Sequence, residues 1–156
     1  MPSLILIIVD IFFLGSLVFN LYWQAQIVIK AKYKVFSAIL TVIFAFWLLS
    51  VPSPSWAYII MVSAFLTVTL MQGTGGLGKK KLVTSGFFSN VIAYDKITHV
   101  TLIPVELPSV KSQVVAVFTV NNRQSIQMTF KCSLADLQEQ LSQVIPQSIE
   151  IEVTQL

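Results

Sequence analysis

Three long hydrophobic stretches fill the first half of the chain, and lysines lie at only one side of them. The stretches run from Leu4 to Trp23, from Val35 to Val51 and from Trp56 to Met71. A helix of about 20 apolar residues rises roughly 30 Å, which matches the hydrocarbon core of a bilayer. The sequence therefore predicts three transmembrane helices, the two shorter ones completed by interfacial neighbours.

The composition also favours a membrane protein. Of the residues, 55% are hydrophobic and only 11% are charged, and the mean hydropathy is +0.79. Soluble domains carry about 25% charged residues. Six of the ten basic residues flank the apolar stretches, so the net charge of +3 indicates orientation in a membrane rather than a nucleic-acid partner.

The lysines beside the stretches predict which side of the membrane each segment faces. They form two clusters, Lys30, Lys32 and Lys34 after the first stretch and Lys79, Lys80 and Lys81 after the third. Cytoplasmic loops are enriched in Lys and Arg, so both clusters are expected in the cytoplasm. The uncharged tail 1–3 and the Pro-Ser turn 51–55 then lie outside. We expect a multi-pass protein of a plasma (inner) membrane, with its N-terminus outside and its C-terminal half in the cytoplasm.

A cleaved signal peptide is the alternative interpretation of the N-terminal stretch. A signal peptide has a basic segment before its apolar region, whereas this stretch is preceded by Met1-Pro2-Ser3 and interrupted by Asp10. These features favour a retained helix. Cleavage would require the orientation to be reconsidered.

Asp10 is the one acidic residue within a predicted span. Intramembrane carboxyl groups often mark ion paths, proton relays or ligand contacts. Fourteen Leu, Ile, Val and Phe residues lie between Leu4 and Leu21, and their insertion energy offsets the cost of about 3 kcal/mol for one central aspartate. Asp10 is thus a candidate site, and a small transport, channel or sensor subunit is the alternative function.

A glycine-rich segment, residues 73–80, joins the two halves. It approaches the phosphate-binding pattern G-x-x-x-x-G-K-[ST], but Lys80 stands where Ser or Thr would ligate magnesium. A strand-like segment follows it, whereas a phosphate-binding loop precedes a helix. We interpret 73–80 as a flexible hinge between a three-helix anchor at 1–72 and a cytoplasmic β-rich domain at 81–156.

The second half of the chain carries the signature of a small α+β domain, mainly antiparallel β. Short apolar or alternating segments predict strands at 82–88, 91–94, 97–105, 114–120, 125–131 and 149–153. Ser133 is a predicted N-cap. It precedes an apolar stripe formed by Leu134, Leu137, Leu141 and Val144. One C-terminal amphipathic helix is therefore expected, ending before Pro146.

The order of these segments carries a resemblance to a known family. One expected strand contains Gly86-Phe87-Phe88 and the next runs from Val91 to Ile97, and a hairpin and the helix follow. This order resembles small bacterial membrane proteins with a pleckstrin-homology-like (PH-like) cytoplasmic domain, which are mostly uncharacterised. The resemblance covers about residues 82–145 and implies a fold but no catalytic residues. Five or six candidate strands are visible where seven are usual, so a truncated barrel or another α+β sandwich stays open.

The residues suited to chemistry are few, and we predict no catalytic, cofactor or metal site. His99 and Cys132 are the only imidazole and thiol, so a membrane enzyme would depend on this pair. A basic surface toward anionic lipids is a further possibility, built from Lys79 to Lys81 with Lys96, Lys111, Arg123 and Lys131. We predict a non-enzymatic membrane protein that presents a cytoplasmic interaction domain to a protein partner or to the lipids of the inner leaflet. The sequence leaves its oligomeric state open.

Overall fold

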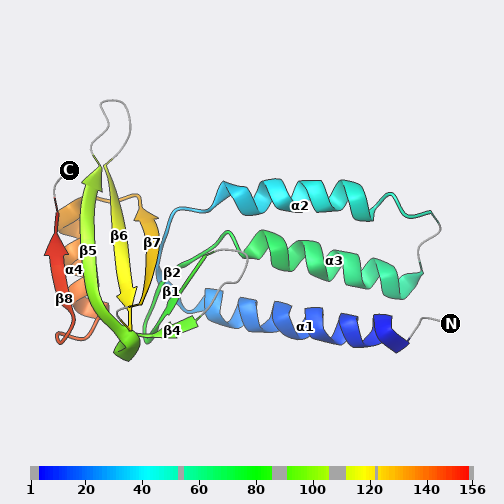
Figure 1. Cartoon of the computed structure of the whole chain (residues 1–156), viewed down its shortest axis with the longest axis horizontal. Helices are drawn as coiled ribbons and strands as arrows, with labels where there is room; N and C mark the ends of the chain where they lie inside the picture. The colour runs from blue at the N-terminus through cyan, green and yellow to red at the C-terminus, as the bar shows by residue number, and fades with distance from the viewer. Residues whose placement is uncertain (1–3, 53–54, 86–90, 106–111, 122, 155–156) are drawn as a thin grey trace.

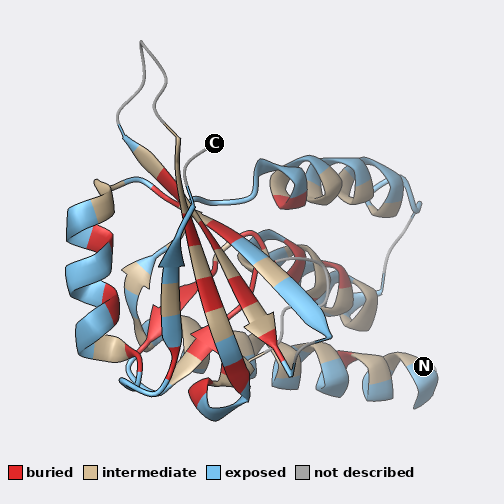
Figure 2. Ribbon diagram, turned by 60° about the vertical axis from the view of Figure 1, so that its left-hand side comes forward, coloured by how far each residue is buried: buried red, intermediate tan, exposed pale blue. Residues whose placement is uncertain are grey.

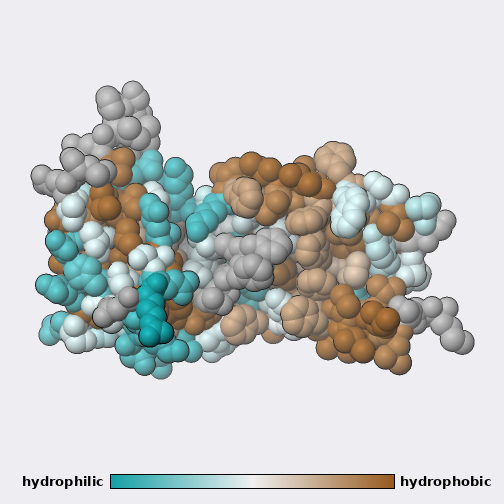
Figure 3. All heavy atoms as spheres, viewed as in Figure 1, coloured by the Kyte–Doolittle hydropathy of each residue, from teal (hydrophilic) through white to brown (hydrophobic). Residues whose placement is uncertain are grey.

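The structure, a computed structural model, describes residues 4–52, 55–85, 91–105, 112–121 and 123–154. Three helices lie side by side and extend away from a β-rich part that carries a fourth helix (Figure 1). The surface of the three helices is largely hydrophobic, whereas hydrophilic residues gather on the β-rich part (Figure 3). The molecule therefore has an apolar end and a polar end, as the sequence predicts.

The three helices are α1 (Leu4–Ala25), α2 (Val35–Leu48) and α3 (Trp56–Met71). Helix α3 lies between the other two and packs against both. The Phe65 ring of α3 makes edge-to-face contacts with Phe13 of α1 and Phe44 of α2, at centroid distances of 5.4 and 5.3 Å. Most other apolar side chains of α1 and α2 are exposed, so this bundle buries only a narrow seam.

Only one of the described helices has the length and composition needed to cross a bilayer alone. Helix α1 has 22 residues, with a window of mean hydropathy 2.5, whereas α2 has 14 and α3 has 16. At about 1.5 Å per residue, α2 and α3 reach only roughly 21 and 24 Å. The expectation of three helices of spanning length is therefore not supported. The second one is shorter than predicted because the chain turns at residues 49–50, after Leu48.

Sheet A contains β1 (Ile27–Lys30), β2 (Gly76–Gly78), β3 (Lys81–Val83) and β4 (Val91–Ala93), antiparallel and in that order. Strand β1 comes from the connection between α1 and α2, while the other three follow α3. The sequence predicts neither β1 nor β2, since their residues lie in the expected inter-helix loop and hinge. The connection between α1 and α2 is thus part of the β-rich unit.

Gly76 explains why a glycine run can form a strand here. A Cβ atom at this position would collide with the Ile29 carbonyl oxygen and would lie 2.6 Å from Cγ2 of Ile27. Only glycine lets β2 approach β1 this closely. The segment that approaches the phosphate-binding pattern is therefore one arm of a β-hairpin, with β3 as the other arm.

Sheet B contains β5 (Ile97–Val105), β6 (Gln113–Val120), β7 (Gln124–Phe130) and β8 (Glu150–Val153), in the order β7-β6-β5-β8. A short 3₁₀ turn, η1 (Tyr94–Lys96), leads from β4 into β5. The predicted hairpin is confirmed as the antiparallel pair β6 and β7. The predicted last strand is also present, as β8, but it pairs parallel to β5. Of the predicted strand 82–88, the structure shows β3 only as far as Val83, and residues 86–88 lie outside the described part.

Helix α4 (Leu134–Val144) confirms the predicted amphipathic helix. The Ser133 hydroxyl accepts a hydrogen bond from the backbone N–H of Asp136 at 3.2 Å, as expected of an N-cap. The buried residues of α4 face the sheets (Figure 2). They join one core with residues of both sheets, whose fully buried members include Leu77, Leu82, Val100, Leu102, Ala116, Phe118, Leu137 and Leu141.

Candidate functional site

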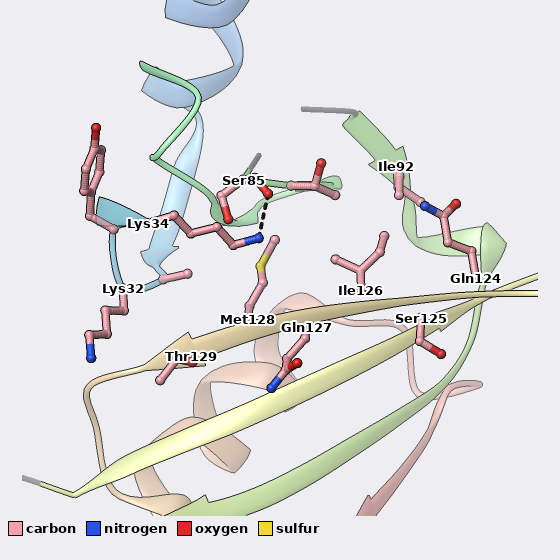
Figure 4. Close-up of a pocket in the computed structure, with 13 residues that line it drawn as sticks. Lys32, Lys34, Ser85, Ile92, Gln124, Ser125, Ile126, Gln127, Met128 and Thr129 are labelled. Atoms are coloured by element: carbon pink, nitrogen blue, oxygen red, sulfur yellow. Dashed lines mark hydrogen bonds between the residues drawn. The ribbon is translucent and has the colours of Figure 1, made fainter. Parts of the chain in front are cut away.

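A cleft of about 440 Å³ lies where the connection between α1 and α2 meets the edge of sheet B (Figure 4). Its walls are residues 31–34 of that connection, Thr84 and Ser85 after β3, Ile92 of β4, and residues 124–129 of β7. Strands β4 and β7 are edge strands of their sheets. The cleft is therefore the opening between the two sheets, closed at one end by the connection.

Backbone hydrogen bonds hold the connection in place. The N–H of Ala31 donates to the Gly75 carbonyl at 3.0 Å, and the N–H of Lys34 donates to the Gly73 carbonyl at 2.9 Å. The Nζ of Lys34 also donates to the Ser85 carbonyl at 2.8 Å (Figure 4). The wall of the cleft is thus built by two segments that are far apart in the sequence.

Strand β7 presents a partly free edge to this cleft. The backbone N–H of Lys32 donates to the Thr129 carbonyl at 2.6 Å, so the Thr129 backbone points away from β6. In an antiparallel pair this direction alternates, so the backbone groups of Ser125 and Gln127 point the same way. Within the described residues, no backbone partner meets them on that side. Among the residues that the structure describes, the edge of β7 is therefore unpaired at Ser125 and Gln127, where a further strand could bind.

The cleft is lined by polar and basic side chains together with apolar ones, among them Ile92, Ile126 and Met128. Gln124, Ser125 and Gln127 are exposed, whereas Met128 is buried. Ile126 and Met128 point to one side of β7, and Ser125 and Gln127 point to the other (Figure 4). Lys32 and Lys34 are the charged residues in the described lining, which holds no carboxylate. An extended segment that pairs with β7 would find hydrogen-bonding side chains along the strand and positive charge near Thr129.

Both predicted lysine clusters lie on the β-rich part, near helix ends. Lys30 ends β1, and Lys32 and Lys34 line the cleft. Lys79 and Lys80 form the turn between β2 and β3, and Lys81 begins β3. Because β1 pairs antiparallel with β2, the two clusters lie at opposite ends of this strand pair.

Asp10 lies far along α1 from this cleft. It is 9% exposed, and its Oδ1 atom has no hydrogen-bond partner within the described part of the chain. Asn20, a polar residue of the same helix, donates to the Ser16 carbonyl at 2.8 Å. Asp10 is therefore the one buried residue of α1, and its Oδ1 accepts no hydrogen bond from the described residues.

Cys132 and His99 are not brought together. The Nε2 of His99 lies 3.1 Å from Oε2 of Glu152 and its Nδ1 lies 3.9 Å from Oε2 of Glu150, both on β8. No hydrogen bond in the described structure joins the ring to Cys132. Burial, and secondarily the negative charge of Asp136, raise the pKa of the Cys132 thiol. This environment disfavours the thiolate that a cysteine nucleophile requires.

Comparison with protein-family models, curated proteins and solved structures found no match for the chain. The geometry of the cleft is suited to the addition of a strand at β7. Sequence analysis did not single out Ser125, Gln127 or Thr129, although it predicted the strand that contains them. Only the order of strands shows that β7 lies at an edge.

Proposed function

We propose that this is an integral protein of a bacterial inner membrane whose cytoplasmic, PH-like domain binds an extended segment of a protein partner along β7. The observation that carries the proposal is the free edge of β7 at Ser125 and Gln127, which opens into a cleft of about 440 Å³. Addition of a strand to an exposed sheet edge is a common way to recognise an extended peptide. The lysines of the cleft favour a segment with acidic residues near its end.

The apolar helices support the membrane placement. Helix α1 is long enough to cross, and α2 and α3 pack beside it with exposed apolar side chains. We propose that all three helices span the membrane together, the bilayer thinning locally or interfacial residues extending the two shorter ones. The lysine-bearing end is then cytoplasmic and the N-terminus is outside.

The strand count supports the PH-like assignment. Strands β1 to β7 followed by α4 match in number the seven strands and one helix expected of such a domain, because the connection between α1 and α2 supplies β1. In this proposal, α2 and α3 form a helical hairpin inserted between the first and second strands. Strand β8 is an addition that extends sheet B.

Reporter fusions test the membrane placement. A fusion after Ser53 should report the outside and a fusion at Leu156 should report the cytoplasm. The same reporter fused after Lys32 is the control for the inner side between α1 and α2. If the Ser53 fusion reports the cytoplasm, α2 and α3 do not span and the multi-pass proposal is wrong.

Photo-crosslinking in native membranes tests binding at β7. A photoreactive residue at Gln124, in the cleft, should form a defined adduct, whereas one at Gln140 on α4 should not. Ser125→Pro should abolish the Gln124 adduct, because proline removes the free N–H and blocks an added strand without removing a bond to β6. Ser125→Ala is the matched control and should keep the adduct. Equal adducts from Ser125→Pro and Ser125→Ala would contradict strand addition.

A transport, channel or sensor subunit is the second candidate, and the unpartnered Oδ1 of buried Asp10 favours it. Ion flux through proteoliposomes containing the purified chain would test it, with a pH-sensitive dye for protons and a potential-sensitive dye for other ions. Asp10→Asn should abolish flux, while Asn20→Leu on the same helix should retain it. Absence of flux in the unsubstituted protein, or equal flux in Asp10→Asn, would remove this role.

A further inference from the structure

Two clefts flank the Trp23 side chain, where α1 meets the β-rich part. One has a volume of about 480 Å³ and is lined by Phe19, Trp23, Lys81 and Lys96, among others. The other has about 420 Å³ and is lined by Tyr22, Trp23 and Lys79 to Lys81, among others. Trp23 and Lys81 are common to both, and the Lys81 Nζ lies 4.6 Å from the centroid of the Trp23 ring. These two residues form the wall between the clefts.

Among the described residues, no carboxylate compensates the positive charge at these clefts. The described linings contain Lys79, Lys80, Lys81 and Lys96 but no carboxylate. None of these lysines forms an ion pair in the part of the chain that the structure describes. Asp95, beside Lys96 in η1, is exposed and outside both linings. An anion bound here would meet several free ammonium groups.

The wall contributed by α1 is apolar and aromatic. Phe19 is 51% exposed and contacts Trp23 edge-to-face at a centroid distance of 6.3 Å. Phe19 is six residues before the end of α1 at Ala25, so it lies about 9 Å deeper along the helix axis. The first cleft thus joins lysines of the β-rich part to an apolar surface on the helix. Tryptophan at this level is typical of the membrane interface.

We infer that the cleft between Trp23, Lys81 and Lys96 binds an anionic phospholipid of the inner leaflet. The lipid phosphate contacts Lys81 and Lys96, and an acyl chain lies over Phe19 and Trp23. Free phosphate shares the chemistry of the lipid headgroup, but the apolar wall of the cleft favours a phospholipid over free phosphate. The inference rests on the proposed membrane placement of α1 and is independent of partner binding at β7.

Native mass spectrometry of the detergent-purified full chain tests this site. Titration with phosphatidylglycerol should give a bound species at lower concentration than titration with phosphatidylcholine. The double variant Lys81→Gln, Lys96→Gln should weaken phosphatidylglycerol binding roughly 30-fold, as expected for two lysines near a lipid headgroup. The charge-matched double variant Lys30→Gln, Lys131→Gln, outside both clefts, should bind as the unsubstituted protein does. Equal weakening in both double variants would overturn the site.

Two further measurements separate a lipid from a soluble anion. Phe19→Ala should weaken phosphatidylglycerol binding severalfold, and glycerol phosphate should not compete with the lipid. Full competition by glycerol phosphate would overturn the lipid assignment, as would equal affinity for phosphatidylcholine. Release of the protein from membranes by alkaline carbonate would instead contradict the membrane placement, so the two failures are distinguishable.

Discussion

The backbone N–H of Lys32 donates a 2.6 Å hydrogen bond to the carbonyl of Thr129. This bond joins the connection between α1 and α2 to the edge of sheet B. It pairs the β7 edge at Thr129, while Ser125 and Gln127 meet no backbone partner on that side among the described residues. The three helices and the β-rich part are therefore connected through paired backbone and not through a flexible hinge. The chain leaves the β-rich part after β1, forms the α2 and α3 hairpin, and returns in β2 beside β1.

The close approach of β1 and β2 should make Gly76 intolerant of a side chain. We expect Gly76→Ala to destabilise the β-rich part by about 1–3 kcal/mol, because the added Cβ meets backbone that cannot move aside easily. Denaturant unfolding of the detergent-solubilised chain would measure this. Gly15→Ala is the control, since a Cβ added there would meet no atom within 4 Å, and it should be neutral or stabilising. A neutral Gly76→Ala would argue against the β1–β2 pairing.

The start of α4 should depend on the Ser133 hydroxyl. Ser133→Ala removes the acceptor for the Asp136 N–H and should cost about 0.5–2 kcal/mol of stability. Ser142→Ala is the control, because the Ser142 hydroxyl is exposed and donates to the Glu139 carbonyl of its own helix. That variant should change stability by less than about 0.5 kcal/mol. Equal effects at the two serines would show that Ser133 is not a significant cap.

Tyr94 should make the β-rich part sensitive to alkaline pH. Its hydroxyl donates to the buried Gly78 carbonyl at 2.6 Å, and burial raises the pKa of Tyr94. The folded state thus favours the neutral phenol, so this contribution to stability is complete below about pH 10, the unfolded pKa, and is lost as the pH rises further. Tyr94→Phe should cost about 1–3 kcal/mol near pH 7 by leaving that carbonyl unpaired.

The difference between Tyr94→Phe and the unsubstituted chain should shrink above pH 10. Unfolding measured from pH 7 to 11 would show this convergence. Tyr22→Phe, at an exposed position, should leave the pH profile unchanged. Parallel profiles for Tyr94→Phe and the unsubstituted chain would contradict the assigned cause.

The Cys132 thiol should react slowly near neutral pH. Its raised pKa lowers the thiolate fraction, so iodoacetamide should alkylate the folded chain more slowly than the chain unfolded in urea. Asp136→Asn should accelerate alkylation by removing the nearby negative charge, whereas Asp95→Asn should not. Rapid labelling of Cys132 at pH 7 would contradict the raised pKa of the thiol and would indicate a reactive cysteine.

Several elements could be predicted because their signals are local. Alternation of apolar residues in 114–120 and 125–131 predicts strands with one buried face. Ser133, followed by the apolar stripe through Leu137 and Leu141, predicts a capped amphipathic helix. The apolar run from Leu4 likewise reports a long helix suited to lipid. Each of these patterns lies within one segment and needs no knowledge of its neighbours.

Strands β1 and β2 could not be predicted in the same way. Ile27 to Lys30 is too short to show a reliable period, and glycines at 76 and 78 have low intrinsic preference for strands. They form strands because each provides the other with hydrogen-bonding partners and because glycine permits their close approach. The hinge and loop expected from composition are therefore replaced by paired backbone.

The sequence by itself determined the apolar and polar ends of this protein, the first long helix, the β6–β7 hairpin and the capped α4, since hydrophobic period and capping act over a few residues. Tertiary structure decided that β1 completes sheet A, that β7 is an edge with open rungs, and that Trp23 meets Lys81. These relationships depend on pairing between distant segments, which no local pattern encodes. The cleft at β7 and the clefts beside Trp23 lie at such junctions, where segments from both halves of the chain meet.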